Sequence, residues 1–258
     1  MKDLLISIAC VAFIAGCATR QAPRDTVSQP TATQTPKSAP ELPQITEKMP
    51  KGPKEIFPGV FFDIDHNIVS FEGIVAIDAH NDRTPTVYLE AIVCTKDTKE
   101  HESLVVTQAR PSHIHAALLL AGHVPGAPGS FDWTGETMKP VQPKGDEVEV
   151  RLIAPGADSD PRTWIMNART QITLRETLQR SHFVFAGSLE RTKPGVTMYD
   201  ADHSGTLIGL STFGTETIAF SQLLNPDSGI EEPVWIADRR QVPKLGTPVR
   251  IEIRSIQR

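Results

Sequence analysis

The chain has 258 residues, 22% of them charged and 39% hydrophobic, which is enough for one domain of about 200 residues with extra segments or for two small domains. Its formal net charge of −5 argues against non-specific nucleic-acid binding, because that binding needs a basic surface. Three cysteines cannot build a dense disulfide framework, and no apolar run reaches the roughly 18 residues of a membrane-spanning helix.

Residues 1–16 are predicted to be a lipoprotein signal peptide. Lys2 provides a short positive start, and residues 4–14 form an apolar run of the length expected for a signal-peptide hydrophobic region. The sequence Ile-Ala-Gly-Cys at residues 14–17 then resembles a lipobox, which implies that the sulfur of Cys17 carries the lipid.

Ala18 bears on both cleavage and destination. The alternative to lipidation is an ordinary secretory signal peptide that is cleaved near Ala18. If Cys17 is lipidated, an alanine after it resembles the sorting signal for the outer membrane. We therefore expect a bacterial envelope lipoprotein, anchored to the outer membrane by acyl chains such as palmitate, with its body in the periplasm or at the cell surface. Each buried acyl methylene contributes about 0.8 kcal/mol, so the membrane is an expected partner through the lipid.

Residues 17–57 are predicted to form a disordered tether. The segment is rich in proline, threonine and glutamine, and it contains no aromatic residue before Phe57. Such a composition cannot bury enough apolar surface to offset the entropy of ordering the chain. Residues 58–258 are then expected to form a single globular domain. With Cys10 removed and Cys17 lipidated, Cys94 is the only free thiol in it.

Period-two patterns predict that the globular part is mostly β-sheet. Residues 59–78 alternate around a turn at residues 66–67 and predict a hairpin. Further strands are predicted at residues 86–95, 104–108, 147–155, 182–189, 206–213 and 249–256. Residues 123–146 are rich in glycine and proline and are predicted to be a long loop, and residues 169–180 to form a short polar helix.

One strong helix is predicted at residues 111–122. Pro111 suits its first turn, Ser112 can cap it and Gly122 can end it. Because the segment is apolar on nearly every face, we expect the helix to be buried. The predicted fold class is therefore α+β, a mostly antiparallel sheet with one buried helix.

A block of motifs at residues 87–126 resembles the YdjY-type domain of bacterial envelope proteins. A strand ending in Cys94 is followed by Lys-Glu-His-Glu-Ser at residues 99–103, a Pro-Ser-x-x-His-Ala-Ala-Leu helix and a Gly-x-x-Pro-Gly turn. A second block, residues 183–188 and 198–213, resembles the Phe-Ala-Gly-Ser and Gly-Thr-x-Ile strands of that family. The resemblance spans roughly residues 58–220 and implies a fold and a candidate site, but no reaction.

The candidate functional cluster comprises residues of the first block: Cys94, Lys99, His101, Glu102, Ser103 and His115. Imidazole and thiolate are suitable zinc or iron ligands, so Cys94, His101 and His115 are the candidate metal ligands. His115 lies in the first turn of the predicted helix, where the helix dipole favours a neutral imidazole.

A purely structural role is the alternative for each residue of the cluster. Cys94 can be a small core residue, Lys99 and Glu102 can pair on a surface turn, and His115 can donate to a backbone carbonyl. The spacing of the cluster matches no recognised metal pattern.

Two acidic segments resemble the beginning of a calcium-binding loop but lack its required residues. The loop that would begin at residue 200 has Ser211 in place of the closing glutamate, and the one that would begin at residue 63 has Ile68 in place of glycine. Both are predicted to be hairpin turns. The tryptophans are predicted to be core or loop anchors rather than sugar- or peptide-binding platforms: Trp133, Trp164 and Trp235.

No complete catalytic constellation is found, so we expect a non-enzymatic binding or structural role. No cofactor is expected, and an envelope protein is the candidate partner besides the membrane. The alternative function is a metal-assisted or thiol-dependent enzyme. In that alternative the thiolate of Cys94 and the imidazoles of His101 and His115 would hold the metal, and Glu102 would move a proton.

Overall fold

A computed structural model describes residues 52–135 and 137–256, which belong to one compact unit. The predicted signal peptide, Cys17 and most of the predicted tether lie outside the described residues. The tether prediction extends too far at its end, because Lys54–Phe57 forms strand β1 and the side chains of Ile56 and Phe57 pack against the core. Among the residues described, we find no helix long and apolar enough to cross a membrane.

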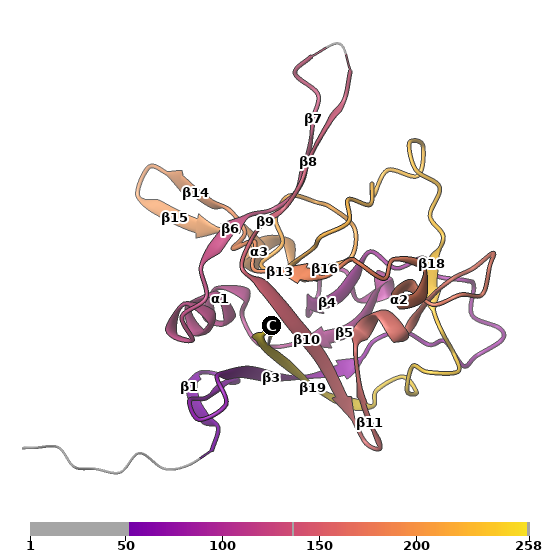
Figure 1. Cartoon of the computed structure of the whole chain (residues 1–258), viewed down its shortest axis with the longest axis horizontal. Coiled ribbons are helices and arrows are strands. Elements are labelled where there is room, and N and C mark those ends of the chain that lie inside the picture. The colour runs from indigo at the N-terminus through magenta and orange to yellow at the C-terminus, as the bar shows by residue number, and fades with distance from the viewer. Residues whose placement is uncertain (1–51, 136, 257–258) are drawn as a thin grey trace, which may run out of the picture. The chain divides into compact units, whose positions relative to one another are not determined.

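The body is an eleven-stranded sheet (Figure 1). The main path runs in the order β16 (Thr206–Gly209), β4 (Ala91–Thr95), β5 (Ser103–Thr107), β3 (Ile68–Val75), β19 (Pro248–Ser255), β10 (Glu147–Ala154), β13 (Phe183–Val184) and β17 (Ala219–Phe220). Three further strands join it: β2 (Val60–Asp63) pairs with β3 and with β1, and β11 (Ala157–Ser159) pairs with β10. Every ladder in the sheet is antiparallel except that of β4 with β5.

The two ends of this path meet, so the sheet nearly closes on itself. Ile208 of β16 forms a bridge with Ile218, which directly precedes β17. The amide of Gly209 donates to the carbonyl of Ile218 at 2.9 Å, and the amide of Ile218 donates to the carbonyl of Leu207 at 2.9 Å.

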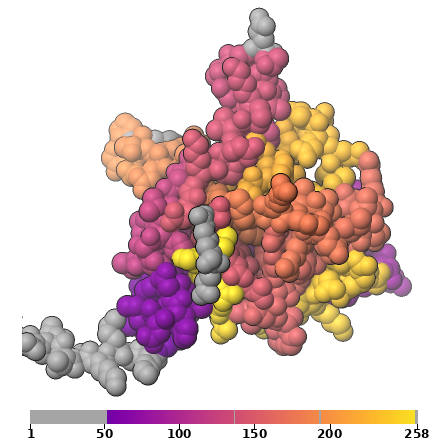
Figure 2. Space-filling model, in the orientation of Figure 1, coloured from indigo at the N-terminus to yellow at the C-terminus, as the bar shows by residue number. Residues whose placement is uncertain are grey.

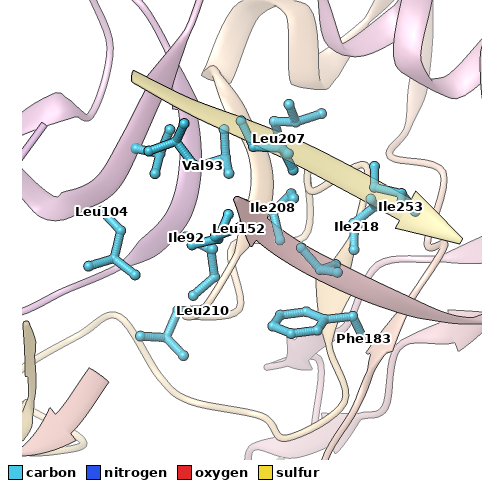
Figure 3. Close-up of a cluster of buried hydrophobic side chains, with 14 of the residues drawn as sticks. Ile92, Val93, Leu104, Leu152, Phe183, Leu207, Ile208, Leu210, Ile218 and Ile253 are labelled. Carbon is cyan, nitrogen blue, oxygen red and sulfur yellow. The ribbon is translucent and has the colours of Figure 1, made fainter. Parts of the chain in front are cut away.

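The core lies inside the nearly closed sheet. β10 and β19 alternate between buried and more exposed positions, as strands with one solvated face do. β4 is buried on both faces, which accounts for its unbroken apolar sequence. Trp164 is also buried in the core, as predicted for a core anchor. Figure 3 shows side chains from five strands in one cluster: Val93, Leu104, Leu152, Phe183 and Ile253.

The predicted strands differ in accuracy. Those at residues 147–155 and 249–256 match β10 and β19 closely. The ones at residues 86–95, 182–189 and 206–213 are longer than β4, β13 and β16, because only part of each apolar run finds a ladder partner.

The prediction of a loop at residues 123–146 is wrong. This segment folds back on itself as two successive strand pairs: β6 (Pro125–Ala127) with β9 (Lys144–Gly145), and β7 (Ser130–Asp132) with β8 (Lys139–Val141). Its glycines permit the pairing, since a Cβ on Gly126 would lie 2.1 Å from the carbonyl oxygen of Lys144. The β7–β8 hairpin projects from the body (Figures 1 and 2).

Two smaller strand pairs and four short helical segments complete the fold. The strand pairs are β12 (Ile165–Asn167) with β18 (Trp235–Ala237), and β14 (Glu190–Lys193) with β15 (Val196–Tyr199). The helical segments are η1 (Glu100–Glu102), η2 (Pro161–Thr163), α2 (Leu174–Thr177) and α3 (Asp200–Ser204). The polar helix predicted at residues 169–180 is thus confirmed only in its centre, as α2.

The main helix lies where it is predicted, as α1 (Pro111–Leu120), and Gly122 follows it with a positive φ of 85°. The prediction that this helix is buried is correct for one face only, because Ile114 and Leu118 lie inside whereas Leu120 remains 63% exposed. The fold class, α+β with a mostly antiparallel sheet, is confirmed.

The predicted capping role of Ser112 is wrong. The carboxylate of Asp202 caps α1, with Oδ1 accepting from the amide of Ser112 at 2.8 Å and Oδ2 from its hydroxyl at 2.7 Å. Asp202 lies in α3, so the prediction of a hairpin turn at residues 200–205 is also wrong. The turn predicted at residues 63–67 is confirmed between β2 and β3.

Candidate functional site

An unusually short connection joins the parallel strands β4 and β5. Only residues 96–102, including η1, lie between them, and the register places Ala91 beside Ser103 and Thr95 beside Thr107. Parallel neighbours usually need a dozen or more residues, because the chain must return to the end where the first strand began. The Lys-Glu-His-Glu-Ser motif makes up the second half of this connection.

Two residues of the motif satisfy backbone groups inside the connection. The carboxylate of Glu100 accepts from the amides of Asp97 and Thr98, the latter at 2.9 Å. The hydroxyl of Ser103 is fully buried and donates to the carbonyl of Lys99 at 2.7 Å. Since buried backbone groups without partners are costly, these contacts stabilise the tight path of the chain. Ser103, predicted as part of a functional cluster, therefore lies in a structural position.

Cys94 lies beneath the same connection and is fully buried on β4. Burial is the largest influence on its thiol, and it raises the pKa of that group. A neutral, buried thiol is a poor nucleophile and a poor metal ligand. The environment of Cys94 is that of a small core residue.

Lys99 is held between a carboxylate and an aromatic ring. Its Nζ lies 2.8 Å from Oε2 of Glu90 and 3.6 Å from the centre of the Phe213 ring. Both the lysine and the glutamate side chains are about three-quarters buried, with exposed fractions of 25% and 23%. The ion pair and the cation–π contact together fix the ammonium group at one position.

Glu90 and Glu102 lie side by side because their strands run parallel. The amide of Glu90 donates to the carbonyl of Glu102 at 2.8 Å, one residue before the Ala91–Ser103 pair. Burial raises the pKa of Glu102, and a hydrogen bond with the Glu90 carboxyl raises it further. The imidazole of His101 lies 3.7 Å from Oε1 of Glu102 and is 73% exposed.

These carboxyl groups face a cleft of about 460 Å³. Its walls include residues 86–90 and 231–235, which are joined by a hydrogen bond of 2.8 Å from the amide of Leu89 to the carbonyl of Trp235. The lining contains four glutamates and two aromatic residues, the side chains suited to contact a positively charged ligand: Tyr88, Glu90, Glu102, Glu231, Glu232 and Trp235. Within residues 52–135 and 137–256, no lysine or arginine lines this cleft.

A buried glutamate supports the ring under Lys99. Oε1 of Glu216 accepts from the amides of Phe213 and Gly214, the latter at 3.2 Å. Oε2 of Glu216 is buried and has no hydrogen-bond partner among the described residues. Burial raises the pKa of Glu216 despite the backbone donors around it.

His115 lies in a different environment, on α1. Its Nδ1 is 2.9 Å from the hydroxyl of Tyr199, and its ring makes an edge contact with Phe185 at 4.9 Å between centroids. Burial lowers the pKa of this imidazole, which favours its neutral form.

The structure therefore divides the predicted cluster. Lys99 and Glu102 are brought together beside the cleft, with His101 at its rim, whereas Cys94 and Ser103 lie beneath the connection and His115 contacts Tyr199. Among the residues that the structure describes, no three His, Cys, Asp or Glu side chains are grouped so that they could hold a metal ion.

Sequence reasoning missed several residues of the site: Tyr88, Glu90, Phe213, Glu231 and Trp235. Glu90 is the one residue with a usable signal, because it directly precedes β4 as Glu102 precedes β5. Recognising that signal requires knowing that the two strands are parallel. Phe213, Glu231 and Trp235 come from segments more than a hundred residues away, and Tyr88 lies in the first block of motifs, where nothing marks it as facing a cleft.

We expect the Cys94 thiol to react only when the protein unfolds. In a Cys10→Ser, Cys17→Ser background, Ellman's reagent at neutral pH should modify Cys94 no faster than global unfolding allows, because the thiol is inaccessible and its thiolate is disfavoured. Cys94→Ala should lower the free energy of unfolding by about 1–2 kcal/mol. Rapid modification of the folded protein would contradict the core assignment, and modification in concentrated guanidinium chloride serves as the positive control.

We expect Glu216→Gln to change how stability depends on pH. Because the folded-state pKa of Glu216 is raised above its usual value of 4.5, its contribution to stability is present below pH 4.5 and is lost as the pH rises through the folded-state pKa. Glutamine does not ionise, so chemical denaturation should show the variant gaining stability relative to the parent protein as the pH rises from 4.5 to 8. An unchanged difference across this range would refute the prediction. The exposed substitution Glu72→Gln is the matched control.

Comparison with known proteins identifies one family. The model of the YdjY domain matches residues 60–254, which include the connection, the cleft and α1. Neither the curated proteins nor the solved structures gave a match. The chain belongs to the YdjY domain family, which suggests an envelope protein and assigns no reaction.

Proposed function

We propose that this member of the YdjY domain family is a lipoprotein of the bacterial outer membrane that binds a cationic organic ligand without catalysing a reaction. The observation that carries the proposal is the environment of Lys99. Its ammonium group lies 2.8 Å from Oε2 of Glu90 and 3.6 Å from the centre of the Phe213 ring, at the edge of the cleft. The protein thus binds its own lysine ammonium with a carboxylate and an aromatic ring, the two groups that commonly bind cationic ligands.

The cleft beside Lys99 offers the same chemistry to a ligand. Glu102 has no lysine or arginine partner among the described residues, and Tyr88 is 41% exposed. An amine or guanidinium could pair with Glu102 and lie against the ring of Tyr88 or Trp235. The cleft volume of about 460 Å³ lies within the range of small-molecule sites, about 300–1,000 Å³.

The geometry favours binding over the two enzymatic alternatives. The thiol-dependent alternative needs an accessible thiolate, whereas Cys94 is fully buried. The metal-assisted alternative needs Cys94, His101 and His115 to converge, whereas they lie in the core, at the rim of the cleft and beside Tyr199. Glu102 remains as a carboxyl group that can carry or release a proton when a cation binds.

The lipid anchor is tested by labelling. Cells that express the parent protein should incorporate labelled palmitate into it, and the protein should fractionate with the outer membrane. Cys17→Ser should abolish the label and release the protein from the membrane, whereas Cys94→Ser should keep both. A parent protein without label, or a label that persists in Cys17→Ser, would overturn the anchor.

The cation site is tested by titration calorimetry with N-acetyl-arginine amide. We expect binding to the parent protein and a loss of about tenfold in affinity in Glu102→Gln, equivalent to about 1.4 kcal/mol. Because the pKa of Glu102 is raised, the carboxyl must lose its proton to pair with the cation. Affinity should therefore increase as the pH rises above the usual glutamate value of 4.5, and Glu102→Gln should lose this dependence.

Two controls make the titration specific. N-acetyl-citrulline amide has nearly the same shape without the charge, so it should not bind measurably. Glu72→Gln, an exposed substitution outside the cleft, should bind the arginine probe as the parent protein does. Equal binding of the two probes, or an unchanged affinity in Glu102→Gln with an unaltered melting temperature, would reject the cleft as a cation site.

A further inference from the structure

A second cavity adjoins the cleft. It has a volume of about 340 Å³ and shares Asn225 and Pro226 with the first cavity. The two residues therefore form the boundary between the cavities. Lys99 lies at this junction, because Glu90, which pairs with its ammonium, lines the first cavity and Phe213, whose ring contacts it, lines the second.

The second cavity repeats the chemistry of the first. Its aromatic lining comes from Phe131, Trp133 and Phe213, and its acidic group is Asp227. One oxygen of Asp227 accepts from the amide of Gly229 at 2.8 Å, and in the described part of the chain no lysine, arginine or histidine forms an ion pair with this carboxylate. Each cavity therefore combines aromatic faces with a carboxylate that, in the described residues, forms no ion pair with a lysine or arginine.

Trp133 is the second feature that points to a ligand. It directly follows β7, on the β7–β8 hairpin that projects from the body (Figure 1). The side chain is 60% exposed and makes no ring contact with another described aromatic residue. A tryptophan that stabilises a fold is normally buried in it, as Trp164 is. Exposed tryptophans beside a cavity are typical anchors of a binding surface.

We infer that the ligand is a peptide segment with two basic residues, one held in each cavity, with the peptide backbone crossing the boundary at Asn225 and Pro226. This inference rests on the proposed function. The cavity volumes favour a peptide over a polyamine, because both cavities lie within the range of about 300–1,000 Å³ that drug-sized ligands fill. A thin polyamine chain would leave most of that space empty and would leave the exposed ring of Trp133 largely uncovered.

Lys99 contacts one lining residue of each cavity, Glu90 of the first and Phe213 of the second. Its ammonium is neutralised by Glu90, so it does not repel a cation in either cavity. The spacing between the two ligand charges is then set by the distance between the cavities, which peptides of different length measure.

The test compares peptides with one and two basic residues on the full-length protein. The series is acetyl-Arg-(Gly)n-Arg-amide with zero to three glycines, matched by the same peptides with citrulline as the second residue. Linking two sites on one chain raises affinity without any new contact in the first cavity. We expect one spacer length to bind about tenfold or more tighter than its citrulline match.

Two variants locate the second residue. In Trp133→Ala and in Asp227→Asn, the tightest dibasic peptide should bind only about threefold or less tighter than its citrulline match. The affinity for N-acetyl-arginine amide should stay as in the parent protein. Trp133→Phe should keep part of the gain, since a ring remains. Because Trp133 and Asp227 are both exposed, these variants are expected to fold, and their melting temperatures check this.

The outcomes separate this inference from the proposed function. If N-acetyl-arginine amide binds at Glu102 but no spacer length adds affinity, the dibasic peptide is wrong and the single cation site stands. Spermidine binding as tightly as the best peptide would also overturn the peptide assignment. If N-acetyl-arginine amide does not bind at all, the proposed function falls first.

Discussion

The short connection between β4 and β5 is the constraint on which the site depends. Seven residues return the chain from the end of β4 to the start of β5. This tight path is stable because the side chains of Glu100 and Ser103 form hydrogen bonds with backbone groups that would otherwise lack partners. The same path places Glu102 next to Glu90 and directs Lys99 towards Phe213. The same motif therefore maintains the fold and places the acidic edge of the cleft. Residues with a structural role and residues that line the cleft alternate within it, so sequence position alone does not tell them apart.

Local patterns predicted the parts of the fold that depend on local physics. The alternation in β10 and β19, the turn before β3 and the glycine after α1 all follow from neighbouring residues, and all were predicted. The strand pairs within residues 123–146 were missed because glycine and proline dominate the composition there, whereas the actual determinant is close backbone packing at Gly126. Likewise, nothing near Ser112 indicates that the cap of α1 comes from Asp202, 90 residues away.

The candidate site was predicted only in part, because a local motif does not show which distant residues pack against it. The motif drew attention to His101 and Glu102, which line the cleft, and to Lys99, which pairs with Glu90 of the lining. It also drew in Cys94 and His115, whose chemistry suits metal binding but whose side chains serve packing and a contact with Tyr199. Lining residues from distant segments, such as Glu231 and Trp235, reach the cleft only through the tertiary fold, which a single sequence does not display.

The closure of the sheet between β16 and β17 is one of the weak seams among the described strands. β10 and β19 are paired over six residue positions, whereas β16 meets the segment before β17 through two backbone hydrogen bonds around Ile218. The amides of Gly209 and Ile218 should therefore exchange with solvent through local opening rather than global unfolding. The turn that carries Phe213 connects the two sides of this seam. A ligand bound against Phe213 would hold the seam shut, so occupancy of the second cavity would be reported by the exchange protection of residues that do not contact the ligand.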